Sequence, residues 1–283
     1  MAKKVNIILD CDTKNEIDDQ FAIVYSLKSP EINLLGVVSV QNTKKHGFSS
    51  VDKYHNEAKK ILKLCNSKVP AFKGSKYPLK SKNKPERSEG TDFIINTVLK
   101  SKEKVFIVGT GPCTNLVNAC LIEPKIMKKC TFIWLGGFRN NGEVKNFKNK
   151  ECNFEGDKFS TKILMELDVD LILLPALGVT DRMISHCPSF IENLHKENTP
   201  ISNYLAKLVR GTKGRFWIFW DIAAPAVAKD FGVVKRKRIP SCKVINGKFY
   251  FPSKNNKKIT IIDSIDELEI LKQAKNIFGK GSF

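Results

Sequence analysis

The sequence predicts an α/β protein built on an open, mostly parallel sheet flanked by helices, with a Rossmann-like core. The chain has 283 residues, of which 42% are hydrophobic and 27% charged, as expected for an ordinary globular protein with one large domain over 1–283. Its apolar runs have strand length and are continuous, as in strands buried on both faces. Helical patterns separate these runs, which indicates consecutive βα units.

The elements follow in order along the chain. Continuous apolar runs predict strands at 5–10, 33–40, 104–110, 130–137 and 169–176. Helices are expected between them at 18–27, 51–65, 91–100, 114–119 and 158–167. We expect loops at 73–90 and 138–157, and long loops in α/β domains are usually functional or mobile. Asn246 and Gly247 predict the turn of a hairpin in the tail, which continues into the apolar run KKITIID.

Charge and cysteine content limit the class of protein. Lys and Arg number 48 against 29 Asp and Glu, a net charge of +19, but the lysines are dispersed, so we expect no nucleic-acid partner. No apolar stretch approaches the roughly 20 residues of a membrane span, and the start lacks a signal-peptide pattern, so we expect a cytoplasmic protein. Eight scattered cysteines without a CxxC pair predict reduced core residues and neither a zinc site nor disulfides.

An acidic cluster follows the first predicted strand. The segment DCDTKNEIDD places Asp10, Asp12, Glu16, Asp18 and Asp19 at a strand end and helix start, which is where open α/β sheets bind ligands. Carboxylates this close repel one another unless a cation neutralises them, and an all-oxygen set favours Ca²⁺ or Mg²⁺. Helix capping by Asp18 and Asp19 is the alternative, but it accounts for only two of the acids.

At this segment the chain resembles the inosine-uridine-preferring nucleoside hydrolase family, whose signature is a strand followed by DxDxxxDD. Five residues separate Asp12 from Asp18 here, where the family usually has three. Further segments are similar to family boxes in the same order, and together they span nearly the whole chain: SVQN at 39–42, VGTGPCTNLVNA at 108–119, IWLGG at 133–137, ECN at 151–153 and WDIAAPAVA at 220–228.

The resemblance implies a fold, a reaction and a set of site residues. It implies Ca²⁺-dependent hydrolysis of the N-glycosidic bond of a small-molecule ribonucleoside, in nucleoside salvage, by a homo-oligomer (dimer or tetramer). Asp12 would be the general base for the attacking water. The Ca²⁺ ligands would be Asp12, Asp19, Asp221 and the backbone carbonyl of Thr110. The ribose hydroxyls would be held by Asp18, Asn42, Glu151 and Asn153.

The chain departs from the family where the nucleobase would lie. Trp220 and Glu89 stand at positions where the family often has histidines. We therefore expect Trp220 to offer a face for base stacking. We expect Glu89 to contact the base, for example by pairing with the ammonium group of a modified nucleoside such as queuosine.

Two other functions remain open from the sequence. A non-catalytic ribonucleoside-binding protein would keep the metal and ribose site but lack leaving-group chemistry, which the missing histidines suggest. A haloacid-dehalogenase-like phosphatase would use the DxDxT pattern in ILDCDT, with Asp10 as nucleophile. The sequence does not identify the nucleobase.

Overall fold

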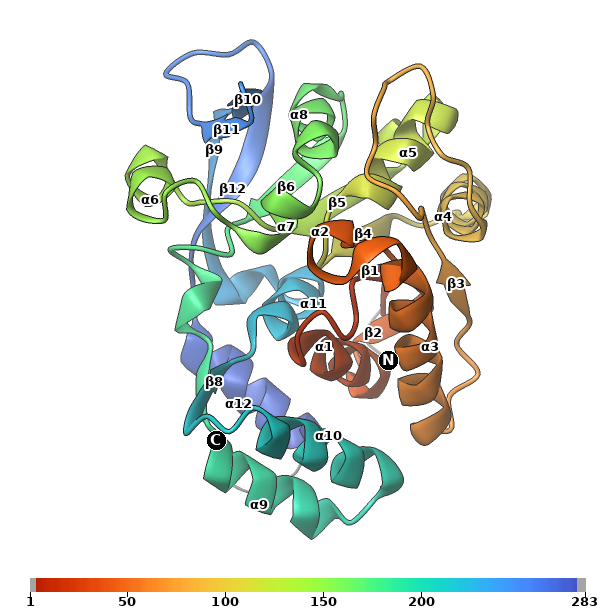
Figure 1. Cartoon of the computed structure of the whole chain (residues 1–283), viewed down its shortest axis with the longest axis vertical. Helices are drawn as coiled ribbons and strands as arrows, with labels where there is room; N and C mark the ends of the chain where they lie inside the picture. Colours follow the sequence, from red (N-terminus) through yellow and green to blue (C-terminus); the bar gives the residue numbers. More distant parts are fainter. Residues whose placement is uncertain (1–3, 279–283) are drawn as a thin grey trace.

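A computed structural model describes residues 4–278 of the chain, and its centre is an eight-stranded sheet (Figure 1). In spatial order the strands are β3 (Ala71–Lys73), β2 (Ile32–Ser39), β1 (Val5–Cys11), β4 (Val105–Gly109), β5 (Cys130–Leu135), β6 (Asp170–Leu174), β12 (Lys258–Ile265) and β9 (Val234–Pro240). Neighbouring strands are parallel except for β12 and β9, which pair antiparallel at one edge. The predicted open, mostly parallel sheet is confirmed.

The order of the strands creates a binding crevice. From β1 the chain passes to β2 and β3 on one side, and then returns to β4 on the other side of β1. Connections leave β1 and β4 in opposite directions, so a crevice opens beyond the carboxyl ends of these two strands. Asp10 and Gly109 pair at those ends, so the acidic segment after β1 and Thr110 after β4 meet at the crevice.

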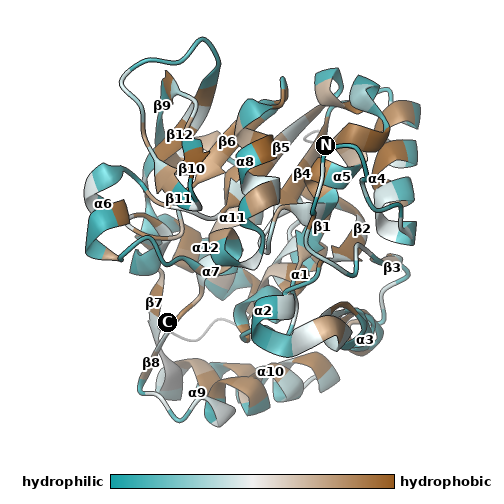
Figure 2. Cartoon of the chain, turned by 45° about the horizontal axis from the view of Figure 1, so that its top comes forward, coloured by the Kyte–Doolittle hydropathy of each residue, from teal (hydrophilic) through white to brown (hydrophobic). Residues whose placement is uncertain are grey.

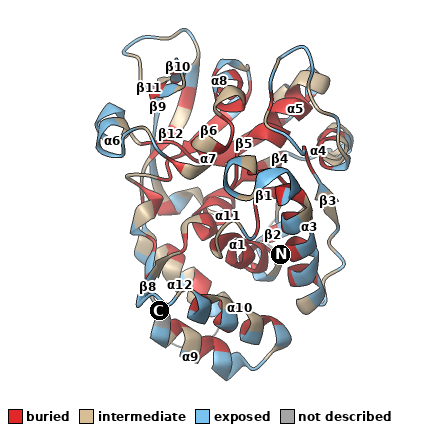
Figure 3. Ribbon diagram, in the orientation of Figure 1, coloured by how far each residue is buried: buried red, intermediate tan, exposed pale blue. Residues whose placement is uncertain are grey.

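Helices cover both faces of the sheet, because strand side chains alternate between two cores. Ile7 and Leu9 face one core, and Ile8 faces the other. The first core contains residues of α1 (Asp18–Lys28), α3 (Ser50–Leu64), α11 (Ala223–Lys229) and α12 (Glu267–Phe278), and the second those of α4 (Glu89–Lys100), α5 (Thr114–Ile122) and α8 (Lys158–Glu166). Hydrophobic residues gather between the layers and hydrophilic ones outside (Figure 2), matching the burial pattern (Figure 3).

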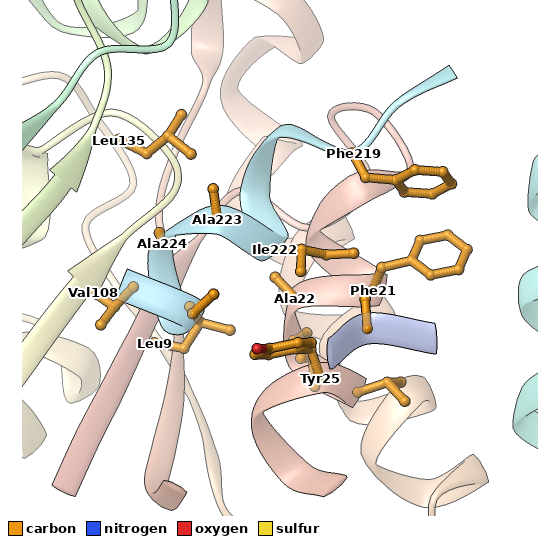
Figure 4. Packing of buried hydrophobic residues seen from close by; sticks show 14 of the residues in the cluster. Leu9, Phe21, Ala22, Tyr25, Val108, Leu135, Phe219, Ile222, Ala223 and Ala224 are labelled. Carbon is orange, nitrogen blue, oxygen red and sulfur yellow. The ribbon is translucent and has the colours of Figure 1, made fainter. Parts of the chain in front are cut away.

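Helix α11 sets the position of one site residue. Its small residues Ala223 and Ala224 are fully buried and lie between α1 and the strands that carry Leu9 and Val108 (Figure 4). Just before them, the short helix η4 (Trp220–Ile222) follows Phe219, whose ring lies 4.8 Å from that of Phe21 in α1. This packing fixes the segment that bears Asp221 beside the start of α1.

The remaining elements complete the outline of the fold. The helices α9 (Cys187–Glu197) and α10 (Pro200–Gly211) lie side by side at the bottom of Figure 1. The short strands β7 (Ile184–His186) and β8 (Phe216–Ile218) form an antiparallel ribbon. Short helical turns are α2 (Thr43–His46), η1 (Gly47–Ser49), η2 (Pro124–Lys128), η3 (Thr180–Arg182) and η5 (Phe231–Val233). No helix among residues 4–278 is long and apolar enough to cross a membrane.

Most of the predicted elements are present, and the differences lie in one expected loop and in the tail. All five strands and five helices are present within a few residues of the expected bounds. The hairpin is also present, as β10 (Lys243–Ile245) and β11 (Lys248–Tyr250), with Asn246 and Gly247 at φ values of +50° and +69°. The expected loop at 138–157 is wrong in part, because it contains α6 (Asn141–Asn146) and α7 (Cys152–Gly156). The run KKITIID enters the central sheet as β12.

The described cysteines lie mostly in the core. Seven are free, and five of those seven are buried. The side chain of Cys187 lies outside the described part of the structure.

Candidate active site

A cavity of about 210 Å³ lies at the crevice beyond β1 and β4. Its wall combines acidic and amide side chains with a few apolar ones. The lining residues are Asp12, Asn15, Glu16, Asp18, Thr110, Leu135, Phe147, Lys150, Glu151, Cys152, Asn153, Ala176, Leu177, Trp220 and Asp221. A larger groove of about 1180 Å³ lies at the other end of the sheet, near Lys128 and Lys257. That groove contains none of the clustered acids, so we take the smaller cavity as the site.

Four buried aspartates converge at this cavity: Asp12, Asp18 and Asp221 line it, and Asp19 contacts them from behind. The exposed fractions of Asp12, Asp18, Asp19 and Asp221 are 2%, 6%, 1% and 4%. Asp19 lies within hydrogen-bonding reach of Asp12 and Asp221, and Asp221 within reach of Asp18. In the described residues no lysine, arginine or histidine forms an ion pair with these four, and Lys45, whose charge acts on Asp12, pairs with Glu16 at 3.0 Å.

Burial controls the ionisation of these acids. Because desolvation disfavours the charged form, burial raises the pKa of Asp12 to about 6 and that of Asp18 to about 8. Burial and the neighbouring carboxylates also raise the pKa of Asp19 and of Asp221 well above the usual range. Buried acids without a cationic partner need either protons or a bound cation, and an all-oxygen set suits a hard divalent ion.

Helix capping does not explain the cluster. The N-cap residue of α1 is Ile17, and no side chain caps this helix end. Asp18 and Asp19 lie in its first turn, where the positive end of the helix dipole favours acids. Asp19 instead accepts a hydrogen bond from Thr110 Oγ1 at 2.6 Å. The Asp19 carboxylate is therefore turned into the site, whereas that of Asp18 also interacts with its own backbone N–H at the helix end.

The chemistry of the donor set fits a divalent cation. The expected ligands are oxygen donors from four segments: the end of β1, α1, the end of β4 and η4. The Thr110 carbonyl accepts one hydrogen bond, from Asn153 Nδ2 at 2.9 Å, so its second lone pair is left for an ion. Among residues 4–278 no three or more Asp, Glu, His or Cys side chains are already arranged as ligands of one ion. The carboxyl groups instead contact one another, Thr110 and Asn42.

Glu151 and Asn153 are held tightly by the backbone around them. Glu151 caps α7: its carboxylate accepts from the backbone N–H groups of Asn153 and Phe154, each at 2.8 Å, and from that of Gly137 at 2.7 Å. Asn153 Nδ2 donates to the carbonyls of Thr110 and Leu135, both at 2.9 Å. Both residues line the cavity, and these bonds tie α7 to the ends of β4 and β5.

A second chain of polar contacts begins at Asp12. Asn42 Nδ2 donates to Asp12 Oδ2 at 2.8 Å and lies 3.9 Å from Cys152 Sγ. Asn15 Nδ2 also donates to Cys152 Sγ, at 3.4 Å. Asn42 is fully buried behind Asp12 and is absent from the cavity wall within the described residues. Its amide holds the Asp12 carboxylate in place.

The two departures from the family signature are placed differently. Trp220 lines the cavity beside Asp221, and its role in base stacking stays a prediction. Glu89 does not line it: this residue is exposed in the first turn of α4, and its charge acts on His55 and Lys73. The capping box at Ser88 begins α4 at Glu89, so the expected loop ends before this residue. Glu89 therefore lies on an exposed helix turn outside the cavity. Within the described residues the cavity wall contains no histidine.

Several wall residues were not anticipated as substrate contacts. Asn15 and Glu16 lie in the segment that is longer than the family signature, and that extra length was the available signal. Phe147 and Lys150 come from the turn after α6, and Cys152 begins α7. These three residues lie in a stretch that was expected to be an irregular loop, so the sequence pattern did not predict that they line the cavity.

Comparisons with known proteins show which family the chain resembles. A family model described as "Inosine-uridine preferring nucleoside hydrolase" matches residues 7–271. The pyrimidine-specific ribonucleoside hydrolase RihB of Escherichia coli (strain SE11) is 23% identical over 234 residues, covering 74% of this chain and 71% of that protein.

Solved structures show the same fold. The purine-preferring ribonucleoside hydrolase from Gardnerella vaginalis matches with a TM-score of 0.78 at 20% identity, over 96% of this chain and 98% of that one. The plant nucleoside hydrolase PpNRh1 matches with a TM-score of 0.76 at 17% identity, over 97% and 99%. The family model covers most of the chain, and the chain belongs to the inosine-uridine-preferring nucleoside hydrolase family.

Proposed function

We propose that this protein hydrolyses the N-glycosidic bond of a ribonucleoside, releasing the base and free ribose, with Ca²⁺ as its cation. The observation that carries the proposal is a group of four buried aspartates, three of which line a cavity at the switch point of a nucleoside hydrolase fold. Asp12, Asp19, Asp221 and the Thr110 carbonyl would hold the ion. Bound there, the ion would lower the pKa of a coordinated water.

Asp12 is the residue best placed to act as general base. Burial raises the pKa of this carboxyl group, and a cation held beside it would favour the ionised form, which can accept a proton from water. The hydrogen bond from Asn42 Nδ2 fixes Asp12 Oδ2, which orients the carboxylate toward the ion and the attacking water. Attack at the anomeric carbon passes through an oxocarbenium-like transition state, whose positive charge the surrounding carboxylates stabilise.

The ribose hydroxyls would contact Asp18 and Asn153. Both line the cavity, and the Asn153 amide nitrogen is already committed to two carbonyls, so its oxygen is the group left to accept from a hydroxyl. Asn42 would act mainly by orienting Asp12. Because the Glu151 carboxylate already accepts three backbone N–H groups, we assign it the positioning of Asn153 in addition to any ribose contact.

A modified base with a cationic group, as in queuosine, remains part of the proposal, but through Glu16 rather than Glu89. Glu16 lines the cavity, whereas Glu89 is exposed outside it. Glu16→Gln should lower kcat/KM for queuosine relative to inosine and uridine, and the matched variant Glu89→Gln should not. Equal effects of the two variants, or no preference for queuosine in the wild type, would contradict this assignment.

The phosphatase alternative is not supported by the position of Asp10. That mechanism needs Asp10 as a nucleophile facing substrate. Asp10 is 1% exposed, accepts a hydrogen bond from Asn115 Nδ2 at 2.7 Å, and lies outside the cavity wall. The non-catalytic alternative keeps one supporting observation, since within the described residues no histidine lines the cavity to protonate a leaving base.

Turnover across a panel of ribonucleosides tests the proposal. Purified protein is incubated with inosine, uridine, cytidine, adenosine and queuosine, with Ca²⁺ and then after chelation, and free ribose is measured. We expect ribose release that chelation abolishes and that added Ca²⁺ restores. Binding without ribose release would favour the non-catalytic alternative. Phosphate release from sugar phosphates, with no ribose from nucleosides, would favour a phosphatase.

A further inference from the structure

We propose that Asn15 recognises the nucleobase, with its side-chain oxygen accepting a hydrogen bond from an N–H donor on the base. The substrate class is then a ribonucleoside whose base carries an imide or amino N–H at its edge. This inference rests on the proposed function, because it takes the occupant of the cavity to be a ribonucleoside.

The Asn15 side-chain amide is held in place by its nitrogen, but its oxygen has no hydrogen-bond partner among the described residues. Its backbone N–H donates to the Asp12 carbonyl at 2.8 Å, which closes a tight turn after β1. Lys14 in that turn has a φ of +89°. Asn15 Nδ2 donates to Cys152 Sγ at 3.4 Å, whereas Oδ1 is buried and accepts no hydrogen bond from the described residues. A buried acceptor left unpaired is costly, and a donor on a bound ligand would remove that cost.

The place of Asn15 in the cavity favours the base over the ribose. The proposed ribose contacts and the proposed general base lie at the buried floor, where Asp12 and Asp18 are almost inaccessible. Asn15, Glu16 and Trp220 are partly exposed, and Phe147 is 39% exposed, so these wall residues lie toward the opening. With the sugar at the floor, the base occupies this outer part.

The outer wall also has the chemistry expected around a base. Trp220, Phe147 and Leu177 provide apolar surface against which a planar ring can pack. Near Asn15 the next polar side chain along the chain is Glu16, whose Oε1 accepts from Lys45 Nζ at 3.0 Å. Both Asn15 Oδ1 and the Glu16 carboxylate are acceptors, so this part of the wall selects a base edge that donates.

The Asn15 contact is linked to Asp12, the proposed general base. Cys152 Sγ lies between two amides, that of Asn15 and that of Asn42, and Asn42 donates to Asp12 Oδ2. The amide of Asn42 must present its nitrogen to the carboxylate, which places its second N–H toward the sulfur. Asn15 is thus connected through Cys152 and Asn42 to Asp12, the proposed general base. A nucleobase bound at Asn15 Oδ1 would extend this hydrogen-bonded chain.

Paired nucleosides that differ in the donor test the inference. Binding of inosine and nebularine, and of uridine and zebularine, is measured by calorimetry, because the second member of each pair lacks the ring imide N–H. For the pair that binds more tightly, we expect the wild type to favour the donor-bearing member about tenfold, the effect of one hydrogen bond to a buried acceptor. Asn15→Leu, which keeps the size of the side chain, should reduce this ratio to within about twofold.

Two further variants complete the design. Asn203→Leu makes the same chemical change on exposed α10 and should keep the wild-type ratio. Asn15→Asp retains an acceptor and should keep the preference, so it covers the case in which Asn15→Leu folds poorly. A ratio unchanged in Asn15→Leu, or no donor preference in the wild type, overturns the inference.

Ribose release from the same samples separates this inference from the proposed function. Hydrolysis with an unaltered ratio in Asn15→Leu overturns the role of Asn15 alone. Donor-dependent binding that Asn15→Leu abolishes, without ribose release by the wild type, overturns the proposed hydrolysis alone. No binding of any of the four nucleosides overturns both.

Discussion

Replacing Glu151 by alanine should destabilise the protein as a whole, even though the residue lines the cavity. The carboxylate accepts three backbone N–H groups, at 2.7, 2.8 and 2.8 Å, and is almost completely buried. Leaving a buried N–H unpaired costs about 1–3 kcal/mol, and losing an N-cap costs about 1 kcal/mol within that total. Three such groups would give roughly 3–9 kcal/mol if all stayed dry.

The lower end of that range is expected, because the adjoining cavity lets water reach some of these groups. We therefore predict a loss of about 3 kcal/mol, a large share of the 5–15 kcal/mol typical of a folded protein. Urea unfolding followed by circular dichroism measures it. The matched control is Glu155→Ala in the same helix, whose carboxylate pairs with Lys44 and Lys158 at the surface and should cost under about 1 kcal/mol.

The result that would refute this reasoning is a loss of less than about 1 kcal/mol for Glu151→Ala. The three hydrogen bonds would then contribute little, and Glu151 would act on substrate alone. Glu151→Gln, which keeps one acceptor oxygen, should fall between the alanine variant and the wild type.

Two further predictions concern the substrate. Because Asp18 and Asn153 would be left unpaired by a missing hydroxyl, the 2′-deoxy form of the best substrate should have a kcat/KM at least about 10²-fold lower, and equal values for the two forms would contradict the ribose assignment. Five carboxylates but only one lysine, Lys150, line the cavity, so the 5′-monophosphate should be hydrolysed at least about tenfold less efficiently than the nucleoside. Comparable turnover of the two would show that the acidic wall does not select against anions.

The sequence could indicate that acids gather at the end of β1, because that part depends on local pattern and strand order. Asp12, Asp18 and Asp19 follow one continuous apolar run, so their convergence needs only a strand that ends at the sheet edge and a helix that begins there. Asp221 lies far from this segment in the sequence, and it was predicted only because residues 220–228 resemble a family segment. Its approach to Asp18 depends on the buried alanines of α11, which periodicity alone does not reveal.

The base-facing wall could not be predicted in the same way, since it is formed by tertiary contacts of irregular segments. Glu89 stands at a family histidine position, yet the capping box at Ser88 starts α4 and leaves the carboxylate exposed. Cys152 reaches the cavity because Glu151 caps a short helix within an expected loop. Asn15 reaches it through the turn at Lys14, whose positive φ has no signal in the residue type.

The most direct test is the rate of ribose release by Asp12→Asn, with the exposed Asp168→Asn as the matched control at the far end of the sheet. Circular dichroism should show both variants folded, and calorimetry with Ca²⁺ should show weaker ion binding for Asp12→Asn only. We predict a fall in kcat of about 10²–10⁴ for Asp12→Asn, the usual effect of losing a general base, with Asp168→Asn unchanged. Near-wild-type turnover by folded Asp12→Asn would contradict the assignment of Asp12 as the base.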